Sequence, residues 1–245
     1  MQTKHGKHQQ LMKFQIVLLC LFFLVELNAT PFYFKSYDME DRLSNNHVTC
    51  CVQDDYGFMW FGTRDGLNRF DSKKFYTFKS YSSEKGSLMS SYILDLAKSP
   101  TGQIWVSTNL GLQKYDYQTD SFTLIDFTKG INCYSLQFDQ QGNLWMILNG
   151  YSLVKYNESQ GMHLNYMYKG SDPITSFYIT PQDQIWPTTA NGNVVFLDDD
   201  KNEFIALDIK NLDKNHPIDD MTAILASPLD NILLIGTKDN GIKRI

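Results

Sequence analysis

The chain of 245 residues is poor in cysteine, carries no surplus of positive charge and shows no sustained helical periodicity. Of its four cysteines, three lie beyond the N-terminal segment, at Cys50, Cys51 and Cys133, and their irregular spacing indicates neither a disulfide framework nor a metal site. The net charge is -5, without a basic cluster after the N-terminal segment, which argues against a nucleic-acid partner. Apolar residues nowhere keep a helical period, so we expect essentially no helix after the N-terminal segment.

Motifs of common catalytic sites are also missing from the sequence. It contains no glycine-rich phosphate loop, no His-Glu-x-x-His and no Gly-x-Ser-x-Gly. The acidic pair Asp54 and Asp55 could serve glycoside hydrolysis, which uses two carboxylates. An aspartate at a repeated turn position is explained more simply by side-chain capping of that turn. We therefore expect a protein without enzymatic activity, metal or cofactor.

The N-terminal segment has the features of a secretory signal. Lys4, Lys7 and Lys13 precede an apolar run over residues 14–25, and the small residue Ala29 follows. The run is shorter than the roughly 20 apolar residues that a transmembrane helix needs. We predict a signal peptide over residues 1–29, with an uncleaved N-terminal anchor as the alternative, so that the rest of the chain leaves the cytoplasm.

The remaining sequence is rich in aromatic residues and repeats itself. Aromatic residues make up 14% of the chain, which suits half-buried strands. Every tryptophan falls on one position of a recurring pattern, at intervals of about 40–45 residues, and a leucine takes this position in the last repeat. These positions are Trp60, Trp105, Trp145, Trp186 and Leu234. Such a period is typical of a four-stranded propeller blade.

Each repeat contains an alternating strand, a turn, the tryptophan strand, a second turn and two further strands. We therefore predict an all-β fold, an incomplete β-propeller of about five four-stranded blades, over residues 30–245. The approximate repeats are 43–80, 88–126, 131–168, 174–208 and 218–245. One tryptophan per blade in a fixed register is interpreted as a structural wedge between blades.

Glycines recur on both sides of the tryptophan. Both turns require a residue with positive φ, which glycine adopts without steric cost. The glycines before the tryptophan are Gly57, Gly102 and Gly142, and those after it are Gly66, Gly111 and Gly192.

The motif of the first repeat resembles the two-component regulator propeller repeat. Residues 54–63 fit the pattern D-x-x-G-x-x-W-x-G-T, residues 64–71 continue it, and residues 43–48 and 88–93 resemble its lead-in. The resemblance implies the periplasmic sensor region of a Bacteroidetes hybrid histidine kinase anchored in the inner membrane. It further implies an oligosaccharide ligand and a kinase core, although no kinase residues lie in this sequence.

The leading hypothesis is therefore a non-catalytic periplasmic sensor of a two-component system. Two alternatives stay open: a periplasmic protein-interaction scaffold and, third, a propeller glycosidase or lyase. Residues 32–37 look like an outer strand that would complete a final blade. Since five blades without that strand leave an exposed edge, we expect a fragment of a sensor kinase, or a chain completed by a second propeller chain.

The turn after the tryptophan strand is the predicted ligand-binding region. It is polar, varies between repeats and recurs once per blade, and polar side chains on rigidly held loops suit sugar hydroxyls or carboxylates. The candidate residues are Arg64, Asp65, Asn109, Asn149, Asn191, Lys238 and Asp239.

Overall fold

The computed structural model describes residues 33–81, 84–191, 193–198, 203–207, 221–226, 233–237 and 241–244. The predicted signal peptide lies outside these residues. The chain divides into two compact units, Met1–Ser36 and Tyr37–Ile245. Within the described ranges, no helix has the length and apolar character that crossing a membrane requires.

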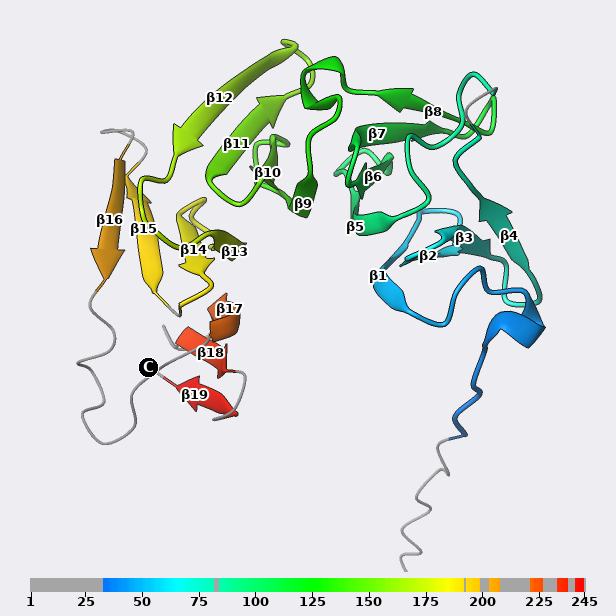
Figure 1. Ribbon diagram of the computed structural model, residues 1–245, viewed down its shortest axis with the longest axis horizontal. Helices are drawn as coiled ribbons and strands as arrows, with labels where there is room; N and C mark the ends of the chain where they lie inside the picture. Colours follow the sequence, from blue (N-terminus) through cyan, green and yellow to red (C-terminus); the bar gives the residue numbers. More distant parts are fainter. Residues whose placement is uncertain are drawn as a thin grey trace, which may run out of the picture. The chain divides into compact units, whose positions relative to one another are not determined.

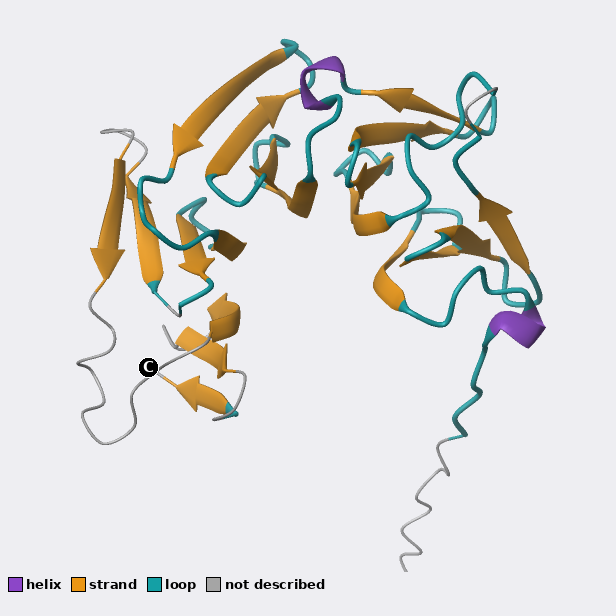
Figure 2. Ribbon diagram, viewed as in Figure 1, coloured by secondary structure: helices purple, strands orange, loops and turns teal. Residues whose placement is uncertain are grey.

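The second unit is built from antiparallel β-sheets, which confirms the all-β prediction (Figures 1 and 2). Its described residues form four four-stranded sheets and one three-stranded sheet, each with its strands in chain order. Two 3₁₀ helices of three residues each, η1 (Met39–Asp41) and η2 (Asp126–Thr128), are the helical elements of the described chain. Residues 33–37 belong to no strand, although the sequence suggested one there, and Tyr33 and Phe34 are exposed. A strand requires hydrogen-bonded neighbours, and the described residues of this segment are not paired in any sheet.

The strand bounds follow the repeats in the sequence. The first and second sheets contain β1 (Val48–Gln53), β2 (Met59–Thr63), β3 (Gly66–Phe70), β4 (Phe75–Phe78), β5 (Ile93–Lys98), β6 (Ile104–Thr108), β7 (Gly111–Asp116) and β8 (Ser121–Leu124). The third and fourth contain β9 (Cys133–Phe138), β10 (Leu144–Leu148), β11 (Ser152–Asn157), β12 (Met162–Met167), β13 (Ile174–Ile179), β14 (Ile185–Thr189), β15 (Val194–Asp198) and β16 (Glu203–Leu207). The fifth contains β17 (Met221–Ala226), β18 (Leu233–Thr237) and β19 (Ile242–Arg244).

The turn between the first two strands is held by one side chain in each four-stranded sheet. In the first sheet, Asp54 Oδ1 accepts hydrogen bonds from the backbone N–H groups of Tyr56 (3.0 Å) and Phe58 (2.9 Å). Gly57 has a φ of 87° at this turn, a conformation that disfavours a side chain. The residues in the place of Asp54 are Ser99, Asp139 and Thr180, and each accepts a backbone hydrogen bond within its own turn.

In the first three sheets, the tryptophan side chain lies at the junction with the next sheet. Trp60 is fully buried, and its ring lies 4.8 Å from the ring of Tyr115 in the second sheet. Trp105 belongs to a buried cluster shared by the second and third sheets, and Trp145 to one shared by the third and fourth. Trp186 is half-buried against Phe196 within the fourth sheet. Leu234, at the same position of the fifth sheet, is also half-buried.

The first strands of successive sheets contact one another directly: β1 contacts β5, β5 contacts β9, β9 contacts β13 and β13 contacts β17. Polar side chains reinforce these contacts. Thr49 Oγ1 donates to the carbonyl of Ile93 (2.9 Å), and Tyr134 OH donates to the carbonyl of Ile174 (2.8 Å). Four-stranded antiparallel sheets that follow one another through their first strands are the architecture of a β-propeller.

Candidate functional site

The turn between the second and third strands of each sheet lies at the end where the chain enters that sheet. Neighbouring strands are antiparallel, so the start of β1 is paired with the end of β2, at Val48 and Thr63. Consistent with this, the N–H of Arg64 donates to the carbonyl of His47 (3.3 Å), just before β1. In the four four-stranded sheets, the candidate ligand residues are therefore placed at one end of the sheet, and the turns held by Asp54 and its equivalents at the other.

In the first two sheets, a threonine at the end of the second strand fixes the shape of this turn. Thr63 Oγ1 accepts from the N–H of Asp65 (3.1 Å) and donates to the carbonyl of Gly66 (2.8 Å). Thr108 makes the corresponding bonds in the second sheet, to Leu110 (3.1 Å) and Gly111 (3.0 Å). Both threonines are fully buried, so the turn is anchored from below while its tip faces solvent.

In the first three sheets, this turn is also bonded to the segment that leads into the next sheet. The N–H of Gly66 donates to the carbonyl of Ser91 (2.7 Å), ahead of β5. The carbonyl of Gly150 accepts from the N–H of Ile174 (2.7 Å), the first residue of β13. The glycines at these turns have positive φ, 135° at Gly66 and 83° at Gly150. The turns are therefore held by both their own sheet and the following one.

The structure leaves four of the candidate side chains exposed at the turn tips: Arg64, Asn109, Asn149 and Asn191. Within the described chain, no hydrogen bond or ion pair joins two of these side chains, since each belongs to a different sheet. Lys238, Asp239 and Gly192 lie outside the described residues. The described candidates therefore form separate polar contact points, once per sheet, and not one enclosed pocket.

Three candidates are engaged in local contacts. Asp65 is ion-paired with Lys79 through a 2.7 Å contact between Oδ2 and Nζ, where both side chains are partly exposed. Asn149 Oδ1 accepts from the N–H of Asn132 (3.2 Å), and the N–H of Asn191 donates to Asp172 Oδ2 (3.3 Å). Ligand contact at Asp65 would compete with the Lys79 ion pair. The side chains of Arg64 and Asn109, by contrast, make no hydrogen bond or ion pair with the described part of the chain.

Asp172 is a residue of this region that the sequence pattern did not single out. Its carboxylate accepts from Asn191 and, through Oδ2, from Asn193 Nδ2 (3.4 Å), so it organises the turn of the fourth sheet. Burial on its own would raise the pKa of Asp172, but hydrogen bonds from Thr189, Asn191 and Asn193 outweigh burial and hold the pKa below its ordinary value. The sequence offered little indication of this role, because Asp172 lies before the first strand of the fourth repeat and outside the aligned motif.

The acidic pair Asp54 and Asp55 has structural roles. Besides capping its turn, Asp54 accepts from Trp60 Nε1 (2.7 Å) and from Tyr117 OH (3.0 Å). Asp55 is ion-paired with Lys98 of the next sheet at 2.6 Å. Among the described residues there is also no group of three or more His, Cys, Asp or Glu side chains that could hold a metal ion.

The free cysteines are consistent with packing roles. Cys50 is half-buried and Cys51 exposed, as expected for neighbours on one strand, while Cys133 is buried. Burial raises the pKa of the Cys50 and Cys133 thiols to about 12, which keeps both protonated at neutral pH.

Comparison with known proteins identifies the first repeat. Residues 42–65 match the family described as two component regulator propeller, so this part of the chain is such a repeat. A stretch of 67 residues is 45% identical to histidine kinase P4 of Formosa agariphila, covering 26% of this chain and 5% of that protein.

Solved structures share the fold over most of the chain. The extracellular domain assigned to a hybrid two component system of B. thetaiotaomicron aligns with 81% of this chain at a TM-score of 0.65 and 22% identity. Virginiamycin B lyase of Staphylococcus aureus also aligns with 81% of the chain, at a TM-score of 0.59 and 13% identity. The chain spans 27% of the extracellular domain and 69% of the lyase.

Proposed function

We propose that this chain belongs to the sensor region of a two-component signalling system, outside the cytoplasm, and that it binds ligand without chemical turnover. What supports the proposal most is the regulator propeller repeat at residues 42–65, together with the 45% identity to a histidine kinase over 67 residues. The kinase output would come from other parts of such a system. The propeller then supplies a rigid scaffold with variable polar turns, which is the usual arrangement for recognition.

The ligand class we propose is an oligosaccharide bound across the turns that follow the tryptophan strands. The exposed guanidinium of Arg64 can donate to sugar hydroxyls, and the exposed amide of Asn109 can both donate to them and accept from them. Because these groups recur once per sheet, an extended ligand would contact several turns, whereas a small one would reach a single turn. The arrangement therefore favours a chain of several sugar units over a monosaccharide at this end of the sheets.

The test is calorimetric titration of the purified chain with neutral and acidic oligosaccharides from plant and algal polysaccharides. We expect one class to bind, and the double variant Arg64→Ala with Asn109→Ala to weaken its affinity about tenfold, as loss of one or two hydrogen bonds would. The matched control is Gln141→Ala with Gln182→Ala, since both glutamines are exposed in turns at the opposite end. This control should bind as the parent chain does.

The two alternatives, an interaction scaffold and a propeller glycosidase or lyase, predict different outcomes of this test. If no oligosaccharide binds and the turn variants instead weaken association with another periplasmic protein, the chain is an interaction scaffold. If bound oligosaccharides are shortened during incubation, as seen by chromatography, the chain is an enzyme and the proposal fails. The expected result is binding with the oligosaccharides recovered intact.

A further inference from the structure

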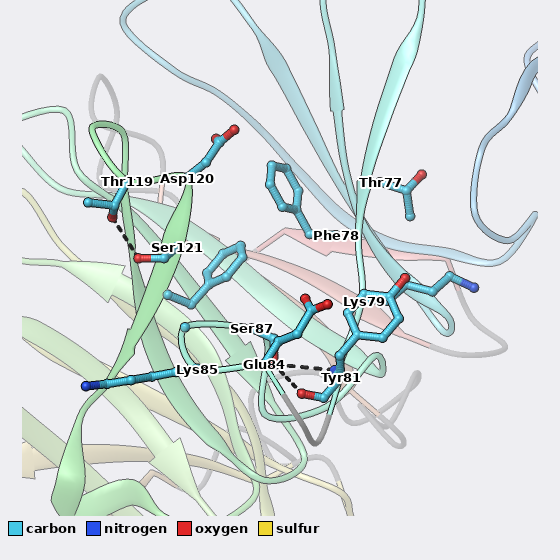
Figure 3. A pocket seen from close by; sticks show the side chains of 12 residues that line it. Thr77, Phe78, Lys79, Tyr81, Glu84, Lys85, Ser87, Thr119, Asp120 and Ser121 are labelled. Atoms are coloured by element: carbon cyan, nitrogen blue, oxygen red, sulfur yellow. Dashed lines mark hydrogen bonds between the residues drawn. The ribbon is translucent and has the colours of Figure 1, made fainter.

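A cavity of about 230 Å³ lies between the outer strands of the first two sheets (Figure 3). Its walls come from the end of β4, the start of β8 with the turn before it, and the connection over residues 84–87. None of the candidate ligand residues at the turns after the tryptophan strands lines it. It is therefore a separate feature, formed by the fourth strands of the first two sheets and by the connection between β4 and β5.

The connection between β4 and β5 creates the cavity by docking onto β8. The carbonyl of Gly86 accepts from the N–H of Phe122 (2.7 Å). Gly86 has a φ of 85°, and a Cβ at this position would lie 2.8 Å from Cβ of Ser121. Any other residue would push the connection away from β8. Glycine at this position therefore lets the two segments close around a fixed space.

One part of the cavity is aromatic. The rings of Phe78 and Phe122 lie edge to face, with centroids 5.5 Å apart, and Tyr81 contributes a third, exposed ring (Figure 3). Phe78 also stacks on Trp60 at 5.7 Å, which fixes its orientation from behind. A fixed aromatic surface of this kind suits the apolar C–H face of a ring-shaped ligand.

The rest of the cavity carries hydroxyl groups. Thr119 Oγ1 and Ser121 Oγ lie 2.7 Å apart, and Ser87 Oγ donates to the carbonyl of Tyr81 (2.9 Å) (Figure 3). Thr119 Oγ1 also donates to Asp116 Oδ2 (2.9 Å). A hydroxyl group can donate once and accept twice, so these side chains keep capacity to accept further hydrogen bonds. They would pair well with a ligand that carries several hydroxyl groups itself.

The charges around the cavity cancel. It is lined by two lysines, Lys79 and Lys85, and by two acidic residues, Glu84 and Asp120. Lys79 is ion-paired with Asp65 at 2.7 Å, and Asp120 with Arg69 at 3.3 Å. A charged ligand would have to compete with these ion pairs or meet a charge of its own sign, which disfavours ionic ligands.

From these observations we infer that the cavity binds a single uncharged sugar ring, held by apolar contact with Phe78 and Tyr81 and by hydroxyl contacts. Its volume is below the roughly 300–1,000 Å³ of sites for drug-sized ligands, which matches a single sugar ring. The inference goes beyond the function proposed above, because it concerns another site, and either site can exist without the other.

The cavity is linked to the junction between the first two sheets. Asp120 accepts a hydrogen bond from Tyr115 OH, and Arg69 donates to the same hydroxyl (2.8 Å). Tyr115 in turn contacts Trp60. A sugar hydroxyl that bonds to Asp120 would therefore act on the side chains that join the two sheets.

The experiment is saturation-transfer NMR on the full chain with the methyl glycosides of glucose, galactose and mannose as probes. We expect transfer from the protein to the ring protons of at least one glycoside. Thr119→Trp places an indole in the cavity and should abolish the transfer. Gln160→Trp is the matched control, because Gln160 is exposed in the corresponding turn of the third sheet, and it should leave the transfer unchanged.

A further variant separates this site from the others. Arg64→Ala with Asn109→Ala should retain the transfer, so failure of the turn site leaves the result unaffected. The inference is overturned if none of the three glycosides shows transfer, if transfer survives Thr119→Trp, or if glucuronate binds more tightly than methyl glucoside.

Discussion

The first and second sheets share one turn geometry but differ in the hydrogen bonding of their tryptophan side chain. Trp60 Nε1 donates to Asp54 Oδ2 (2.7 Å), whereas the buried Nε1 of Trp105 has no hydrogen-bond partner among the residues that the structure describes. In the second sheet the residue at the position of Asp54 is Ser99. The third sheet follows the first, with Trp145 bonded to its aspartate at 3.0 Å, and Nε1 of Trp186 in the fourth is again without a partner.

This difference separates two requirements of the repeat. The backbone of the turn closes equally in both sheets, from Asp54 to Phe58 (3.0 Å) and from Ser99 to Gln103 (2.9 Å). One oxygen on the capping side chain is enough for the turn, and serine supplies it. Only a carboxylate offers a second oxygen that reaches the indole, so serine fulfils the turn requirement and leaves the indole unpaired.

The largest expected effect is that of Asp54→Ala. It removes an acceptor for Trp60 and Tyr117 as well as the turn cap, and leaves a buried indole N–H without a partner. We expect the free energy of unfolding to fall by about 3 kcal/mol. Ser99→Ala removes only the turn cap and should lower it by about 1 kcal/mol. Denaturant unfolding measures both, and equal losses would contradict the separation of the two requirements.

The glycines of these turns give the next effect. Gly102→Ala and Gly142→Ala both force an alanine into positive φ, 84° and 81°, at a cost of about 1–2 kcal/mol. A Cβ at Gly102 would also collide with the carboxylate of Asp55, which is ion-paired with Lys98, while the space around Gly142 is open. Gly102→Ala should therefore be the more destabilising by a few tenths of a kcal/mol. The opposite order of melting temperatures would contradict this account.

The sequence predicted the repeated strands and the register of the tryptophans, because both follow from periodic residue types. It did not reveal which indoles are hydrogen-bonded, since Asp54 and Ser99 are equally good turn residues. It also missed the cavity beside Gly86, because one of its walls is the connection between β4 and β5, which lies outside the repeated motif. The repeat pattern placed Arg64 and Asn109 in the turns after the tryptophan strands. It did not give the distance between them, because that distance depends on how the sheets are spaced.

Ser99→Asp converts the second sheet to the pattern of the first. The new carboxylate should keep the turn and accept from Trp105 Nε1, which raises the free energy of unfolding by about 1 kcal/mol. Pro100→Asp, at the exposed position next to Ser99, is the matched control for added charge and should give no gain. A loss of stability in Ser99→Asp would show that the second junction cannot admit the aspartate geometry.

The smallest effect concerns a second position at which the two sheets differ. Cys50 in β1 and Asp95 in β5 both follow the bulge of their strand, opposite Gly62 and Ser107. Burial raises the pKa of Asp95 above its ordinary 3.8, although the N–H groups of Leu136 and Leu96 lower it in part. Because the folded pKa is raised, this carboxyl favours folding most when protonated, and that contribution is lost as the pH rises.

In the parent chain, the N–H of Leu136 donates to Asp95 Oδ2 (2.7 Å). Asp95→Asn removes the buried charge and keeps one side-chain oxygen that can accept this hydrogen bond. We expect the variant to be slightly more stable than the parent at neutral pH. The difference should shrink as the pH is lowered towards 4 and the native carboxyl becomes protonated. Thermal unfolding across this pH range measures it, and a difference that grows in acid would contradict the assignment.

The buried clusters are each shared by two neighbouring sheets, one cluster for the first and second, one for the second and third, and one for the third and fourth. Such a molecule behaves as a one-dimensional array whose cooperativity is transmitted from neighbour to neighbour. If the cluster between two sheets is weakened, partial unfolding would begin or stop at that junction. Evolution could alter a distant repeat without disturbing the first, which explains how the motif can fade along the chain while the architecture persists.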